Sequence, residues 1–76
     1  MAFVPVVSAA LTAVNFDRRA GRLVIQFGEK FYAYEGVPDE VVLDFMFADS
    51  IGSEFSKLVK KGGYSFRQIT AEAAIQ

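Results

Sequence analysis

The 76-residue sequence predicts an α+β fold, with two short helices packed on one face of an antiparallel sheet. Two observations support this class. In the first half, apolar and polar residues alternate at the two-residue period of strands, and turn residues separate the runs. In the second half, apolar residues recur at the spacing of helices, between a Pro-Asp-Glu start and a Gly-Gly stop. The expected order is β-β-β-α-α-β, in a single domain over residues 1–76.

Three strands open the expected fold, at Leu11–Phe16, Arg22–Phe27 and Lys30–Glu35. The polar segment Asp17–Gly21 suits a hairpin loop of about 3–5 residues, and Gly28-Glu29 suits a tight turn. We therefore expect a three-stranded antiparallel meander.

Two helices follow. Pro38 is expected at the first helical position, with acidic residues beside it at the positive end of the helix dipole, and the helix continues over Val41–Ala48. Ser50 can cap the second helix through its hydroxyl. Lysines and then Gly62-Gly63 end that helix.

A short strand, Tyr64–Ile69, closes the fold, and the sequence does not specify its partner. The tail Thr70–Gln76 either continues as a helical turn or frays. The helix-covered face of the sheet is expected to carry one of two sets of strand residues, together with apolar residues of the helices. These are Leu23, Ile25 and Phe27 or Tyr32 and Tyr34, with Val41, Phe45, Phe55, Leu58 and Val59.

Composition excludes several classes of protein. The chain has no cysteine and no histidine, which excludes disulfide toxins, zinc folds, and hydrolases that depend on either residue. Eight basic and nine acidic residues give a net charge of −1, unlike a histone-like protein. The acidic residues of the first helix lack a metal-loop or phosphate-loop pattern, so we expect a solvated helix edge. We expect no enzyme activity, no cofactor, no metal, no small-molecule substrate, no membrane segment and a cytoplasmic location.

Four blocks occur in order along the chain. They are Val6-Val7-Ser8, the Tyr-x-Tyr block Phe31–Pro38, the block Ala48–Gly52 before Phe55, and Tyr64–Ile69. Over roughly Pro5–Ile69 the sequence resembles the KTSC domain, named for the C-terminus of some lysyl-tRNA synthetases. This resemblance implies a small domain that also occurs alone in bacteria and phages. It implies no catalytic residues, and RNA binding has been suggested for the family.

The first helix has apolar residues on two sides. At 100° per residue, Val41, Val42, Phe45 and Met46 form the side that faces the sheet. Leu43 and Phe47 lie on the other side, four residues apart, and Ile51 continues their line. At these three positions the KTSC family tends to have polar or basic residues. We expect this apolar stripe to bind a protein partner or a second copy of the chain, most simply as a homodimer. Alternatively, Ala71–Ile75 or Phe3-Val4 covers it.

A second hypothesis is that the domain binds RNA or single-stranded nucleic acid. Tyrosines could stack on unpaired bases, and a basic block near the C-terminus could contact phosphates. Alternatively, the tyrosines pack in the core and the lysines compensate the helix dipole. The candidate residues are Tyr32, Tyr34, Lys57, Lys60, Lys61, Tyr64 and Arg67.

Overall fold

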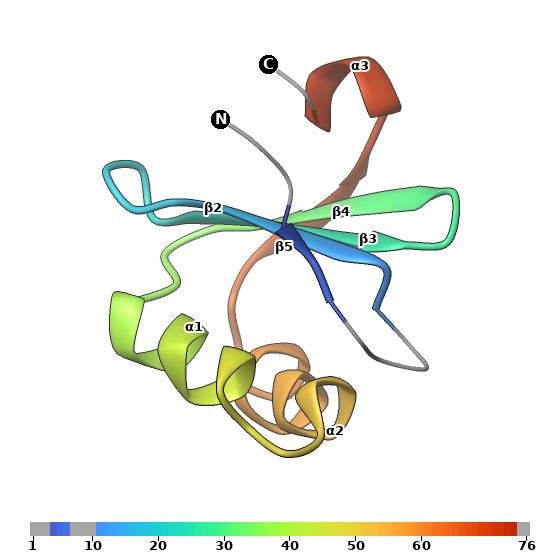
Figure 1. Cartoon of the computed structure of the whole chain (residues 1–76). Coiled ribbons are helices and arrows are strands. Elements are labelled where there is room, and N and C mark those ends of the chain that lie inside the picture. The colour runs from blue at the N-terminus through green and yellow to red at the C-terminus, as the bar shows by residue number, and fades with distance from the viewer. Residues whose placement is uncertain (1–3, 7–10, 75–76) are drawn as a thin grey trace.

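The computed structural model describes residues 4–6 and 11–74 and contains one five-stranded antiparallel sheet whose strand order follows the chain. Helices α1 and α2 lie on one face of the sheet and the short helix α3 lies on the other (Figure 1). This arrangement confirms the expected α+β fold and its β-β-β-α-α-β order, and adds β1 and α3 at its ends. The elements are β1 (Val4–Pro5), β2 (Ala13–Asp17), β3 (Arg22–Phe27), β4 (Lys30–Tyr34), α1 (Asp39–Met46), α2 (Ile51–Phe55), the π-helical turn η1 (Ser56–Lys60), β5 (Phe66–Ile69) and α3 (Ala71–Ala74).

Each hairpin loop is stabilised by a local feature of its own sequence. In the β2–β3 loop the Asp17 carboxylate accepts hydrogen bonds from the backbone N–H groups of Arg19, at 3.1 Å, and Ala20, at 3.3 Å. In the β3–β4 hairpin Phe27 pairs with Lys30, which leaves a two-residue loop. Its first residue, Gly28, has φ +61°, as a type II′ turn requires.

The register between β3 and β4 decides which strand residues face the helices. Leu23 lies opposite Tyr34, and Ile25 lies opposite Tyr32. Opposing residues of paired strands share a face of the sheet. The two sets that the sequence offers as alternatives therefore lie on the same face, and both contribute to the core.

The helices begin and end close to the expected positions, with two differences. Pro38 is the residue before α1, with ψ 154°, so the first helical residue is Asp39. Ser50 precedes α2, but its hydroxyl forms no capping hydrogen bond, so the expected hydroxyl cap is wrong. The Ser50 carbonyl instead accepts the N–H of Glu54 at 3.1 Å. After Phe55 the helix widens into η1, in which the Lys61 N–H reaches the Ser56 carbonyl at 3.1 Å.

The main core lies between the sheet and the helices α1, α2 and η1. The rings of Phe45 and Phe55 meet edge to face at its centre, with centroids 5.6 Å apart. Among the described residues, ten buried ones form this core: Leu11, Val14, Leu23, Ile25, Tyr34, Val37, Val42, Phe45, Phe55 and Val59.

A much smaller apolar cluster covers the opposite face of the sheet. There Val24, Ala33 and Ala74 are buried, with Phe31 and Ile69 packed against them. The Thr70 hydroxyl accepts the N–H of Ala73 at 3.1 Å and caps α3. The tail thus continues as a helical turn.

The position of α3 bears on the alternative that the C-terminal tail covers the apolar stripe. Residues 71–74 lie on the sheet face opposite to α1 (Figure 1), so they do not cover its outer side. Val4 pairs with Val14 at the sheet edge. Phe3 and Ile75, which complete that alternative, lie outside the described residues.

Candidate functional site

The outer side of α1 presents two large apolar side chains to solvent. Leu43 is 54% exposed, and Phe47, immediately after the helix, is 83% exposed. We call these two residues the α1 patch. Ile51, the third residue of the expected stripe, is half-buried and packs against the main core. It leaves the line because α1 ends at Met46 and the chain turns before α2 begins. The expected stripe is therefore a two-residue patch.

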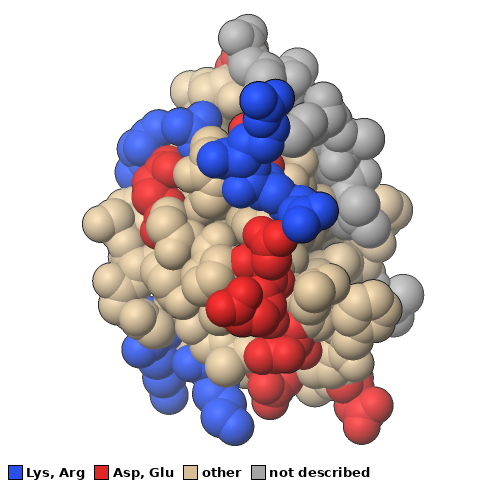
Figure 2. Space-filling view, turned by 90° about the vertical axis from the view of Figure 1, so that its left-hand side faces the viewer, with Lys and Arg blue, Asp and Glu red and all other residues tan. Residues whose placement is uncertain are grey.

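Three acidic residues of α1 and one arginine, Arg18, lie beside the α1 patch, and Arg18 lines a hollow together with Leu43. Asp39 forms an ion pair with Arg18 at 2.8 Å, whereas Glu40 and Asp44 form none within residues 4–6 and 11–74. The last turn of α1 contains no basic residue, so the helix itself does not compensate the negative end of its dipole near Phe47. On this side of the molecule the acidic side chains gather into a band (Figure 2).

The two tyrosines of β4 differ in exposure. Tyr34 is only 3% exposed and packs edge to face on Phe55 at 5.6 Å. Phe66 stacks on it at 5.2 Å with an interplanar angle of 26°. Tyr34 therefore has no free ring face for a nucleobase, and this candidate is a core residue because the register places it under the helices. Tyr32 is half-buried, and its ring contacts Phe27 at 5.7 Å.

Burial also changes the acidity of Tyr34. Loss of solvent raises the pKa of its phenol above the ordinary value of 10.0, and the neighbouring Tyr32 adds to that increase. The phenol of Tyr34 therefore holds its proton more tightly in the folded protein than an exposed tyrosine does.

A pocket opens where the aromatic residues of the sheet meet η1. Its volume is about 410 Å³, within the range of roughly 300–1,000 Å³ found for ligand pockets. Phe66 forms part of its wall and is 61% exposed. We call it the aromatic pocket; its lining residues are Phe27, Lys30, Tyr32, Tyr34, Lys60 and Phe66.

Sequence reasoning missed three of these lining residues. Phe66 joins Tyr34 only because β5 pairs with β4 in the register Tyr34–Phe66, and the sequence does not specify the partner of β5. Lys30 and Phe27 lie at the β3–β4 turn, where alternation alone indicates their faces but not a pocket.

The predicted basic block does not form one surface. Lys60 lines the aromatic pocket, whereas Lys57 and Lys61 are exposed and do not line it. Arg67 contacts the Glu35 carboxylate at 3.5 Å, which also accepts a bond from Arg22 at 3.1 Å.

Arg67 follows Phe66 in β5, so its side chain lies on the other face of the sheet from the pocket. Tyr64 is half-buried against the main core. Of the seven nucleic-acid candidates, only three line the pocket, namely Tyr32, Tyr34 and Lys60.

Within residues 4–6 and 11–74, no three acidic side chains come close enough together to hold a metal ion. In the same ranges, no helix has the length and apolar character that crossing a bilayer requires.

Comparison with known proteins places this fold in a family. The KTSC domain model matches residues 7–65. A protein of Stutzerimonas stutzeri (strain A1501) named only as uncharacterized is 33% identical over 63 residues, which cover 82% of this chain and 89% of that protein. The crystal structure of a KTSC domain protein from Yersinia pestis superposes with a TM-score of 0.82 at 33% identity, covering 90% of this chain and 96% of that one. The chain belongs to the KTSC domain family.

Proposed function

We propose that this KTSC domain is a non-enzymatic binding module that contacts protein through the α1 patch. The observation that carries the proposal is the exposure of Phe47 beside Leu43. Burying such a side chain gains about 1.5–3 kcal/mol, which is a large share of the stability of a small domain. Contiguous exposed apolar side chains with a polar rim are typical of protein contact sites.

The rim of the patch indicates the chemistry of its partner. Glu40 and Asp44 carry negative charge beside the apolar side chains, and the end of the helix dipole adds to it. The complementary surface is an apolar site surrounded by basic residues. The proposal places the protein in the cytoplasm, whose reducing environment suits a chain without cysteines.

The variant Phe47→Asp tests the proposal. Its matched control is Ser53→Asp, which adds the same charge at an exposed position of α2. We expect the parent protein to self-associate in sedimentation equilibrium or to retain a protein from nuclease-treated bacterial lysate. Phe47→Asp should lose this association, and Ser53→Asp should keep it. A monomeric parent whose captured proteins are the same as those of Phe47→Asp would contradict the proposal.

One observation favours a second candidate function, which is the binding of single-stranded nucleic acid. In the aromatic pocket, the exposed ring of Phe66 and the half-buried ring of Tyr32 lie in the same wall as Lys30 and Lys60. Stacking of a base on such a ring contributes about 1–3 kcal/mol, and lysines contact phosphates.

Fluorescence anisotropy with a short single-stranded RNA tests this candidate. We expect binding that weakens as salt rises and that is lost when Lys60→Glu and Lys61→Glu are combined. The parent protein's failure to bind at low salt would rule the candidate out.

A further inference from the structure

We propose that the aromatic pocket of one copy of this chain receives the α1 patch of the next copy, with Phe47 entering the pocket in a head-to-tail contact. The inference rests on the proposed function, because it names the partner of the α1 patch. It requires that the two surfaces match in charge and chemistry, and that they lie apart on one molecule.

The charges of the two surfaces are complementary. Glu40, Asp44 and the negative end of the α1 dipole lie beside the patch, and the one arginine that borders it, Arg18, is already paired with Asp39. Lys30 and Lys60 line the pocket. All the ion pairs among residues 4–6 and 11–74 involve arginines, so both lysines remain available for carboxylates of another copy.

The same charges disfavour a two-fold contact between two α1 patches. In such a contact each residue meets the same surface of the other copy. Glu40 and Asp44 of both copies would then belong to one small interface, and like charges gathered in an interface repel. A head-to-tail contact instead places these carboxylates near lysines.

The pocket also suits an aromatic side chain. It is lined by four aromatic rings, of which Phe27 and Tyr32 meet edge to face at 74° and Tyr34 and Phe66 stack at 26°. A further ring can pack against them in either geometry. The cavity of about 410 Å³ is large enough for ligands bigger than one phenylalanine side chain.

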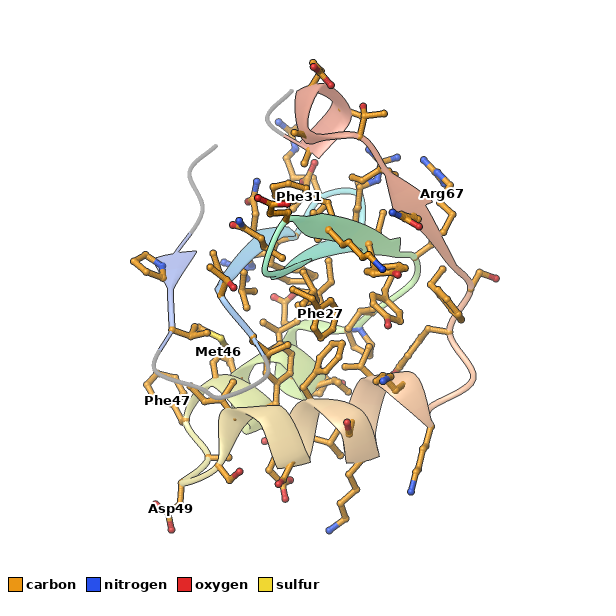
Figure 3. All side chains as sticks on the ribbon, turned by 90° about the vertical axis from the view of Figure 1, so that its right-hand side faces the viewer. Phe27, Phe31, Met46, Phe47, Asp49 and Arg67 are labelled. Atoms are coloured by element: carbon orange, nitrogen blue, oxygen red, sulfur yellow. The ribbon has the colours of Figure 1, made fainter. Side chains whose placement is uncertain are left out.

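The two surfaces lie apart on the molecule. Figure 3 shows Phe27, a residue of the pocket wall, between the sheet and the helices, and Phe47 at the outer edge of the molecule. A copy whose Phe47 is bound therefore still offers a free pocket. Head-to-tail contacts of this kind continue into longer assemblies unless the rotation closes a ring.

Sedimentation velocity with interference optics tests the inference, since a chain without tryptophan absorbs weakly. The parent protein should gain mass with concentration beyond two copies or form a closed ring. Phe47→Asp alone should be monomeric. A pocket variant, Lys60→Glu combined with Phe66→Ala, should also be monomeric. Thermal melting by circular dichroism checks that each variant is folded.

Mixing the two monomeric variants gives the decisive result. Phe47→Asp retains an intact pocket, and the pocket variant retains an intact Phe47, so a mixture should form a species of two copies and nothing larger. Lys61→Glu is the matched control for charge, because Lys61 follows Lys60 in the chain and is exposed but does not line the pocket. This control should assemble like the parent protein.

Three outcomes would overturn the inference. If Phe47→Asp is monomeric but the pocket variant assembles like the parent, the α1 patch binds elsewhere, and the proposed function stands without the pocket. If Phe47→Asp also assembles like the parent, self-association does not use the α1 patch. Neither the proposed function nor the head-to-tail contact then explains the assembly. If the parent is monomeric at all concentrations and the pocket variant loses RNA binding, the occupant of the pocket is nucleic acid.

Discussion

The two sides of α1 carry similar residues in opposite environments. Phe45 is completely buried against the sheet and Phe55, whereas Phe47, two residues later, is 83% exposed. Two residues correspond to a rotation of about 200° around a helix, which is enough to reverse the environment. The inner side is explained by the fold alone. The outer side has no role in the main core, so it is the side on which a binding function has to be sought.

The largest expected effect is on the free energy of unfolding, and it should separate variants of Phe45 from variants of Phe47. Phe45→Ala should lower the free energy of unfolding by about 3–5 kcal/mol, because it leaves a cavity at the centre of the core. Phe47→Ala should change it by less than about 0.5 kcal/mol in the monomer, as exposed positions do. Urea unfolding of dilute protein measures both. Equal losses would show that the two sides of α1 do not differ as described.

An intermediate effect is expected for Ile51→Ala. Ile51 is half-buried against the core, so its loss should be smaller than the 2–5 kcal/mol of a fully buried isoleucine, about 1–2 kcal/mol. Urea unfolding again provides the measurement. A negligible loss of stability together with weaker self-association would contradict this. It would show that Ile51 belongs with Leu43 and Phe47 to a three-residue apolar stripe.

The smallest expected effect is a change in stability that comes from Tyr34, in the core below α1, and that appears only at alkaline pH. The pKa of Tyr34 is raised in the folded protein, so the folded state holds the phenolic proton more tightly than the unfolded state does. Stability from this group is fully present below the ordinary pKa of 10.0 and falls as pH rises above it. Denaturation midpoints of the parent and Tyr34→Phe should therefore decline differently only above pH 10. Parallel curves would indicate that the Tyr34 phenol is not buried.

Features set by local chemistry were predictable from the sequence. Asp17 and Gly28 specify the hairpin loops through a side-chain hydrogen bond and a left-handed glycine. Pro38 and Gly63 mark where the helical region begins and ends, and Gly63 has φ +82°. Each signal acts within a few residues, so the surrounding fold does not alter it.

Features set by the pairing of distant segments were not predictable. The stacking of Phe66 on Tyr34 and the contact of Arg67 with Glu35 both require the register of β5 against β4. The inward turn of Ile51 depends on the angle between α1 and α2. These details decide which candidate residues reach a surface, and for this reason the aromatic pocket could not be read from the sequence.

The order of the strands also has a consequence for folding. The first four strands pair with close neighbours along the chain, but β4 ends at Tyr34 and β5 begins at Phe66. Pairings between distant segments form slowly, whereas hairpins form in about 1–10 μs. During synthesis and refolding, we expect β4 to remain an unpaired edge until both helices have formed. During that time the edge strand can pair with other chains. Prompt arrival of the C-terminal strand is thus what protects the nascent domain from aggregation.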